Sequence, residues 1–275
     1  PVGPMYWDVL IYYDAIGRMN AGQWPVTDFQ VPVGPLEYWL AWLNYQFFPE
    51  AHPILLTQLE WLPITAPAMA LILWDASKRS SRAVWGLLLA WVLYTALPFN
   101  DMIYNNFAGS DGYGIYNRHG SHLMFLTAAT VLFVRSRYLQ TALFSILLVS
   151  LALCKITAFA AVGPLLILGL LTRRIHPFVA GATALICIGI TGILQLATGV
   201  IAGYVTDILV LAQENSGTLL PRFLTATSLR IDVLLPGALL CLVLFWREVL
   251  SFRRPRDREQ RGIIGFLDGD WVWIE

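Results

Sequence analysis

The fold is decided by residues 137–174, "RYLQTALFSILLVSLALCKITAFAAVGPLLILGLLTRR". This stretch begins and ends on arginine and contains two apolar runs, 138–154 and 156–171, with Lys155 between them. A helix needs about 20 apolar residues to cross the hydrocarbon of a bilayer, with roughly 17 to 25 as the range. Each run therefore predicts a short crossing that uses some flanking residues, which places Lys155 at the turn between the two.

The composition of the whole chain is that of a membrane protein. Hydrophobic residues make up 57% of the 275 residues and charged residues 13%, whereas soluble domains average about 45–50% and about 25%. The mean hydropathy is +0.62. Backbone polar groups cannot stay unpaired in lipid, and the apolar runs lack the alternation of barrel strands. We therefore expect an all-α fold, a multi-pass transmembrane helical bundle with outward-facing loops that carry short amphipathic helices.

Further apolar runs complete this predicted bundle. They lie at 54–76, 83–99, 121–135, 178–202 and 231–248, with a shorter aromatic run at 34–48. The short run contains Glu37 among its Trp and Tyr residues, so we expect a half-buried or interfacial helix there.

The predicted organisation is a single membrane domain over 1–275. It comprises a first outward loop (1–33), transmembrane helices and loops (34–251), and a basic cytoplasmic segment that leads into a further segment (252–275). The chain opens on Pro1 without a methionine or a signal peptide, so we expect a fragment of a longer protein, with a spanning segment before residue 1.

Clusters of positive charge predict the orientation, because short cation-rich loops stay in the cytoplasm. These clusters are "SKRSSR" (77–82), "RSR" (135–137), "TRR" (172–174) and "FRRPRDREQR" (252–261). We interpret the last as an orientation signal and expect no nucleic-acid partner. The polar stretches 100–120 and 203–230 then face outward with the first loop. Together these outward segments gather Asp8, Asp14, Asp28, Asp101, Asn105, Asn106, Asp111, Tyr116, Asn117, Arg118, His119 and Lys155.

Lys155 has two interpretations at the turn in "LALCKITAF". An ionised lysine at the centre of a membrane helix costs about 2.5 to 3.5 kcal/mol on insertion scales, but at a helix end its stem can extend toward water. Lys155 is then either an interfacial lysine or a partner for a lipid-linked phosphate at the membrane surface. Arg118 and His119, in "YNRHG" (116–120), would add donors from a second loop.

Asp8 begins an amphipathic stretch, "DVLIYYDAIGRM" (8–19), whose apolar positions predict a helix along the membrane surface. A carboxylate at the start of that helix either caps it or takes the proton of an attacking hydroxyl. The three cysteines, Cys154, Cys187 and Cys241, have no metal-binding spacing, so we expect neither a metal cluster nor a disulfide from them.

The order of motifs in the first 36 residues resembles the first outward loop of the C-type integral-membrane glycosyltransferases. Asp8 is followed by "YYDAIGRMNAGQWP" (12–25), "TDF" (27–29) and "GPL" (34–36), with Val26 where that family has an aromatic residue. "YNRHG" and "KITAF" (155–159) are similar to a later loop and a lysine of bacterial members. These enzymes take a sugar from a polyprenyl-phosphate donor.

The resemblance implies a site and a location. It implies that Asp8 is the general base on the acceptor hydroxyl, and that Asp28 orients the loop of Asp8 or binds the acceptor. Lys155 and Arg118 would stabilise the departing polyprenyl phosphate, and His119, Asn117 and Tyr116 would also bind substrate. Transfer would invert the configuration at the anomeric carbon of the sugar. No metal is required, although some relatives use a divalent ion, for which Asp8 and Asp28 are candidate ligands. The protein would lie in the bacterial inner (plasma) membrane, with its site facing outward.

Two other classes of protein remain open. A non-catalytic membrane subunit of a larger complex explains the apolar bulk and the 11 tryptophans without any role for Asp8 or Lys155. A lipid or solute transporter would use an intramembrane lysine and proline-interrupted helices such as "PITAPAMALILW" (63–74), although no internal repeat is visible.

Overall fold

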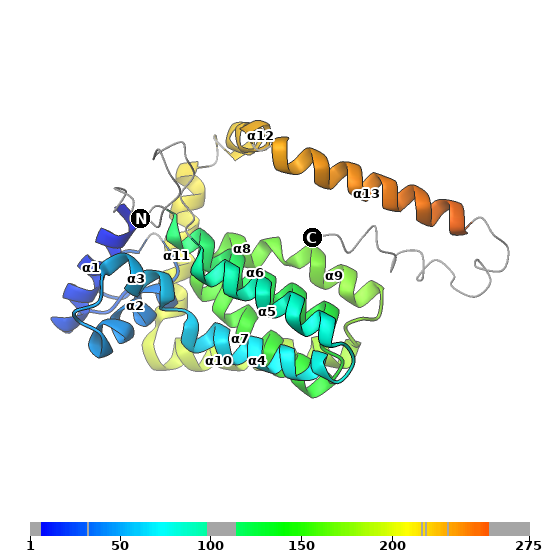
Figure 1. Ribbon diagram of the computed structural model, residues 1–275. Helices are drawn as coiled ribbons and strands as arrows, with labels where there is room; N and C mark the ends of the chain where they lie inside the picture. Colours follow the sequence, from blue (N-terminus) through cyan, green and yellow to red (C-terminus); the bar gives the residue numbers. More distant parts are fainter. Residues whose placement is uncertain are drawn as a thin grey trace. The chain divides into compact units, whose positions relative to one another are not determined.

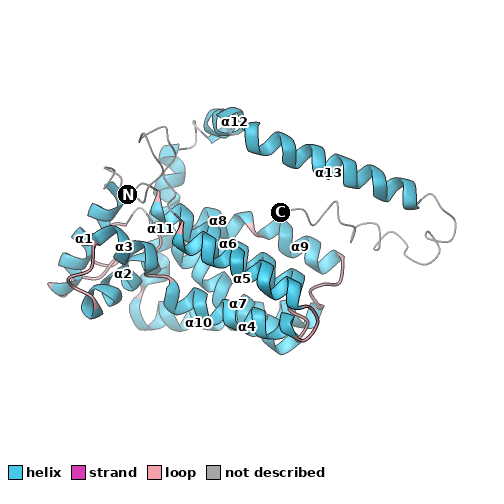
Figure 2. Cartoon of the chain, viewed as in Figure 1, coloured by secondary structure: helices cyan, strands magenta, loops and turns pink. Residues whose placement is uncertain are grey.

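The computed structural model describes residues 7–31, 33–97, 114–215, 217, 219–229 and 231–252. Over these residues the regular structure is helical, which confirms the expected all-α fold (Figures 1 and 2). Two compact units are distinguished: residues 1–166 with 176–209, and residues 167–175 with 210–275. The candidate site belongs to the first unit.

The first unit begins with a small helical group made of α1 (Trp7–Asn20), α2 (Pro35–Phe47) and α3 (Pro53–Leu59). The predicted amphipathic helix is confirmed as α1, whose buried face follows a helical spacing. That face consists of Val9, Tyr12, Ala15, Ile16 and Met19. It packs against α2, where the rings of Tyr12 and Tyr38 lie 5.4 Å apart.

The rest of the first unit is a bundle of longer helices. These are α4 (Leu62–Ser77), α5 (Ser81–Ala96), α6 (Ile115–Phe133), α7 (Arg137–Cys154), α8 (Ile156–Ala161), the start of α9 (Gly163–Leu171), α10 (Pro177–Thr198) and the first part of α11 (Val200–Asn215). α7 packs against both α6 and α10.

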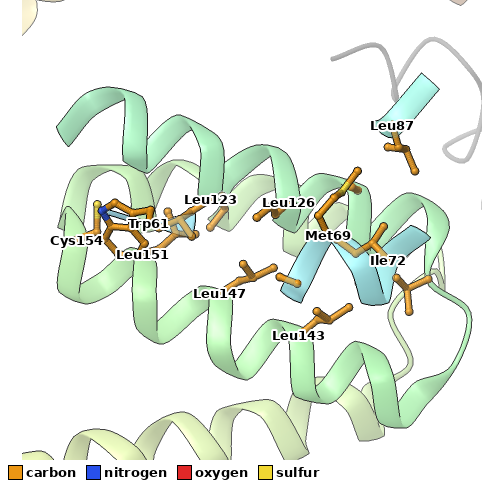
Figure 3. Packing of buried hydrophobic residues seen from close by; sticks show 14 of the residues in the cluster. Trp61, Met69, Ile72, Leu87, Leu123, Leu126, Leu143, Leu147, Leu151 and Cys154 are labelled. Carbon is orange, nitrogen blue, oxygen red and sulfur yellow. The ribbon is translucent and has the colours of Figure 1, made fainter. Parts of the chain in front are cut away.

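One apolar core joins α4, α6 and α7 along most of their length. Figure 3 shows Trp61 and Cys154 at one end of this core and Ile72 and Leu143 toward the other. Among the described residues, three helical segments are long and apolar enough to cross a membrane: Pro53–Ser77, Arg137–Cys154 and Pro177–Thr198. In Pro177–Thr198, only 11% of the most apolar 18-residue stretch is buried inside the protein. An apolar helix that is so little covered by the rest of the protein is typical of one that faces lipid.

The start of α2 touches the end of α7 at a glycine. The Gly34 N–H donates to the carbonyl oxygen of Cys154 at 2.8 Å. A Cβ atom at Gly34 would lie 1.9 Å from the carbonyl oxygen of Leu153, so no larger residue fits. The "GPL" motif therefore brings α2, and Glu37 with it, against Cys154.

Several segments predicted as polar outward loops are helical. "YNRHG" forms the first turns of α6, because Gly114, with φ of 68°, lets the helix begin at Ile115. The stretch 203–230 is occupied by α11 and α12 (Leu219–Leu229). The apolar run 178–202 is divided at Gly199, whose φ of 72° ends α10.

The second unit contains the end of α9, the end of α11, α12 and α13 (Ile231–Phe252), and α13 holds Pro236 inside the helix. Four residues of the predicted outward surface and the basic run 252–261, apart from Phe252, lie outside the described residues. Those four are Asp101, Asn105, Asn106 and Asp111.

Candidate functional site

Asp8 lies in the first turn of α1, as predicted. Its carboxylate accepts a hydrogen bond from the backbone N–H of Gly114, the residue that caps α6. The two residues are far apart in the sequence, so this contact fixes the start of α1 at the entry of α6. Asp8 is partly exposed to solvent.

Lys155 lies between α7 and α8 in an extended conformation, at the turn predicted for it. Its Nζ contacts the Oδ1 of Asn117 and lies 4.6 Å from the centroid of the Tyr116 ring. Burial lowers the pKa of Lys155, and the charges of Cys154, Glu37 and Asp8 act in the opposite direction. Asp8 and Lys155 thus both contact the start of α6, Asp8 through Gly114 and Lys155 through Asn117. We call Asp8, Lys155, Asn117 and Tyr116 the surface group.

Asp28 and Arg118 have contacts elsewhere. The Asp28 carboxylate accepts a hydrogen bond of 2.7 Å from the backbone N–H of Trp24, which closes the turn that contains Val26 at φ of 74°. Arg118 donates to the carbonyl oxygens of Tyr94 at 2.7 Å and of Thr95 at 3.0 Å, at the end of α5. Asp28 therefore stabilises the turn 24–28, and Arg118 joins α6 to the end of α5.

A second polar group lies inside the protein and centres on Glu37, which is fully buried. Its Oε2 accepts hydrogen bonds from the hydroxyl of Tyr12 at 3.2 Å, the indole Nε1 of Trp61 at 3.0 Å and the Nδ1 of His119 at 2.8 Å. Its Oε1 lies 2.7 Å from the Sγ of Cys154. Four different helices or helix junctions thus supply donors to one carboxylate. The pKa of Tyr12 is raised by burial and by the charge of Glu37.

Glu60 is the second acidic residue of this group and is also fully buried. It lies between α3 and α4, within the candidate span Pro53–Ser77. Its Oε1 is 3.6 Å from the Nδ1 of His119. Within the described part of the chain, neither oxygen of Glu60 has a hydrogen-bond partner, and neither has the Nε2 of His119. We call Glu37, Glu60 and His119 the buried triad.

All four residues of the surface group were predicted from the sequence as site residues, but the buried triad was not predicted as a group. His119 was predicted to bind substrate, and the structure places it beside the two glutamates. Glu37 was noted only as a polar residue in an aromatic run, and Glu60 was not noted at all. A signal was present, because an acidic residue inside an apolar segment long enough to span a membrane marks a functional site by default.

Comparisons of this chain with protein-family models, with curated proteins and with solved structures found no match.

Proposed function

We propose that the protein is a membrane glycosyltransferase of the polyprenyl-phosphate-dependent kind, acting on the extracytoplasmic side. One observation carries the proposal: a carboxylate, Asp8, and an amine, Lys155, act on the same turn of α6, where α7 ends. The carboxylate of Asp8 suits deprotonation of an acceptor hydroxyl, and the amine of Lys155 suits binding of a phosphate. Three of the described helical segments are long and apolar enough to cross a membrane, which supports a donor that is held in the bilayer by its lipid.

The proposed reaction is a single displacement. Asp8 accepts the proton of the acceptor hydroxyl as its oxygen attacks the anomeric carbon of the sugar. The bond between that carbon and the phosphate oxygen breaks, and the electron pair leaves with the polyprenyl phosphate. Lys155, with Asn117 and Tyr116 beside it, stabilises the negative charge that develops on this leaving group. Attack from the opposite side inverts the anomeric centre.

Sugar transfer by the protein in membranes tests the proposal. A panel of radiolabelled polyprenyl-phosphate sugars is offered to the wild type and to Asp8→Asn and Lys155→Ala. General-base catalysis contributes about 10²–10⁴-fold, so Asp8→Asn should lose transfer by that factor while the protein stays folded. Asp14→Asn is the matched control, because Asp14 lies on the same helix and pairs with Arg18 at 2.8 Å.

Transfer that is unchanged in both variants would reject the proposed site. No transfer from any donor would favour a non-catalytic membrane subunit or a transporter. Uptake of the same labelled lipids into sealed vesicles would separate these two.

A further inference from the structure

We propose that the buried triad, Glu37, Glu60 and His119, binds one divalent transition-metal ion of the Zn²⁺ class. The residues come from α2, from the junction of α3 and α4, and from α6. This site is distinct from the surface group and does not depend on the proposed transferase activity.

The distances within the triad suit a shared ion. One ligand atom from each residue can be chosen so that all three lie within 4.8 Å of one another. The Nδ1 of His119 is 2.8 Å from the Oε2 of Glu37 and 3.6 Å from the Oε1 of Glu60. Around a tetrahedral Zn²⁺ with bonds of about 2.0–2.2 Å, neighbouring ligand atoms are about 3.3–3.6 Å apart. The two observed separations bracket this range, and a bound ion would take the place of the proton through which the Nδ1 of His119 donates to Glu37.

Glu60 is an independent indication of a ligand. Its side chain is 0% exposed, and neither of its oxygens has a hydrogen-bond partner in the described structure. Leaving a buried polar group without a partner is unfavourable, and more so when the group is charged. A metal ion bound to Glu60 removes this cost.

The charges also favour a divalent cation. A divalent ion that displaced the protons from both glutamates would balance their combined charge of −2 in this fully buried site, because buried charges are normally paired or bind metals. The cations of the neighbouring elements have other partners: Lys155 contacts Asn117, and Arg118 donates to carbonyl oxygens of α5. One divalent ion therefore balances both carboxylates.

The groups around Glu37 resemble the outer shell of a metal site. Tyr12 and Trp61 donate to the carboxylate that would bind the ion, and such donors orient the ligand. One imidazole and two carboxylates suit Zn²⁺ or Mn²⁺ better than Ca²⁺, which prefers six to eight oxygen ligands.

The test is a titration of the purified protein in detergent with Co²⁺, a spectroscopic substitute for Zn²⁺, followed by displacement with Zn²⁺. The wild type should bind one equivalent and show visible ligand-field absorption that Zn²⁺ removes. Glu60→Gln and His119→Gln should bind Co²⁺ at least about tenfold more weakly, because even outer-shell changes cost about 10–100-fold.

His122→Gln is the matched control. His122 is buried one turn further along α6, and its ring lies 5.3 Å from that of Tyr94 and 6.2 Å from that of Trp91, away from the carboxylates. It should bind Co²⁺ as the wild type does. A second measurement needs no variant: removal of metal from the wild type with a chelator should lower its melting temperature.

Absence of the absorption in the wild type, or equal loss in the His122 variant, would overturn the proposal. A Glu60→Gln variant that is more stable than a wild type that binds no Co²⁺ would also overturn it, and would show that the two glutamates share a proton instead.

Discussion

Tyr12 and Tyr13 are neighbours in the sequence with opposite roles in the structure. The Tyr12 hydroxyl donates to the buried Glu37, whereas the Tyr13 hydroxyl is buried without a hydrogen-bond partner among the described residues. Hydrogen bonds to charged groups contribute about 1.5–3 kcal/mol. We therefore expect Tyr12→Phe to lower the free energy of unfolding by that amount, and Tyr13→Phe to change it by less than about 0.5 kcal/mol. Thermal unfolding of both variants in detergent measures this. Equal losses would show that the hydroxyl of Tyr12 is not a specific partner of Glu37.

At the scale of residues, the sequence predicted groups that stand out against apolar surroundings. Asp8 and Lys155 could be found because each lies at the end of an apolar or amphipathic stretch, and both lie at helix ends in the structure. The link between Glu37 and Glu60 could not be found. It depends on the approach of α2 to α4 and α6, and no local pattern gives the packing of helices that are separated in the sequence.

At the scale of elements, Gly34 sets the position of α2. Its φ is −65°, which any residue adopts, so the need for glycine comes from the close approach to Leu153. A methyl group there would meet backbone that cannot move aside, and overpacking commonly costs about 1–3 kcal/mol and occasionally more. We expect Gly34→Ala to lower the free energy of unfolding by more than about 3 kcal/mol, measured by thermal unfolding.

Gly86→Ala is the matched control for this prediction. Gly86 lies inside α5, and a Cβ atom there would meet nothing within 4 Å. Alanine in a helix interior is favoured over glycine by about 0.8–1.0 kcal/mol, so this variant should be slightly more stable than the wild type. A Gly34→Ala variant of wild-type stability would mean that α2 does not approach α7 as closely as described.

Element boundaries followed from the sequence where hydrophobicity alone decides them. The runs 138–154 and 156–171 correspond to α7 and to α8 with α9. The predictions failed for polar stretches: "YNRHG" and 203–230 were interpreted as loops because they are polar, yet both lie largely in helices. A helix satisfies its own backbone hydrogen bonds, so polar side chains do not prevent these stretches from forming one.

At the scale of the whole first unit, two of the basic clusters and the surface group lie at opposite ends of the bundle. Asp75 pairs with Lys78 at 3.3 Å and Arg79 at 3.1 Å and accepts a bond of 2.8 Å from the backbone N–H of Arg135. The cation clusters 77–82 and 135–137 thus share one end, and the surface group lies at the other end of α7. With 18 residues, α7 is about 27 Å long at 1.5 Å per residue, close to the hydrocarbon thickness of about 30 Å.

This separation makes the predicted orientation measurable. Gln30 is exposed in the first loop, and Ser81 is exposed within the cation cluster 77–82 at the end of α4. Short cation-rich loops stay in the cytoplasm, so Gln30→Cys should react with a membrane-impermeant maleimide added to intact cells, and Ser81→Cys only after permeabilisation. The wild-type chain gives the background from its own three cysteines. The reverse pattern would place the surface group in the cytoplasm, where an extracytoplasmic lipid-linked donor cannot reach Asp8. Labelling of both variants in intact cells would mean that α4 does not separate them across the bilayer.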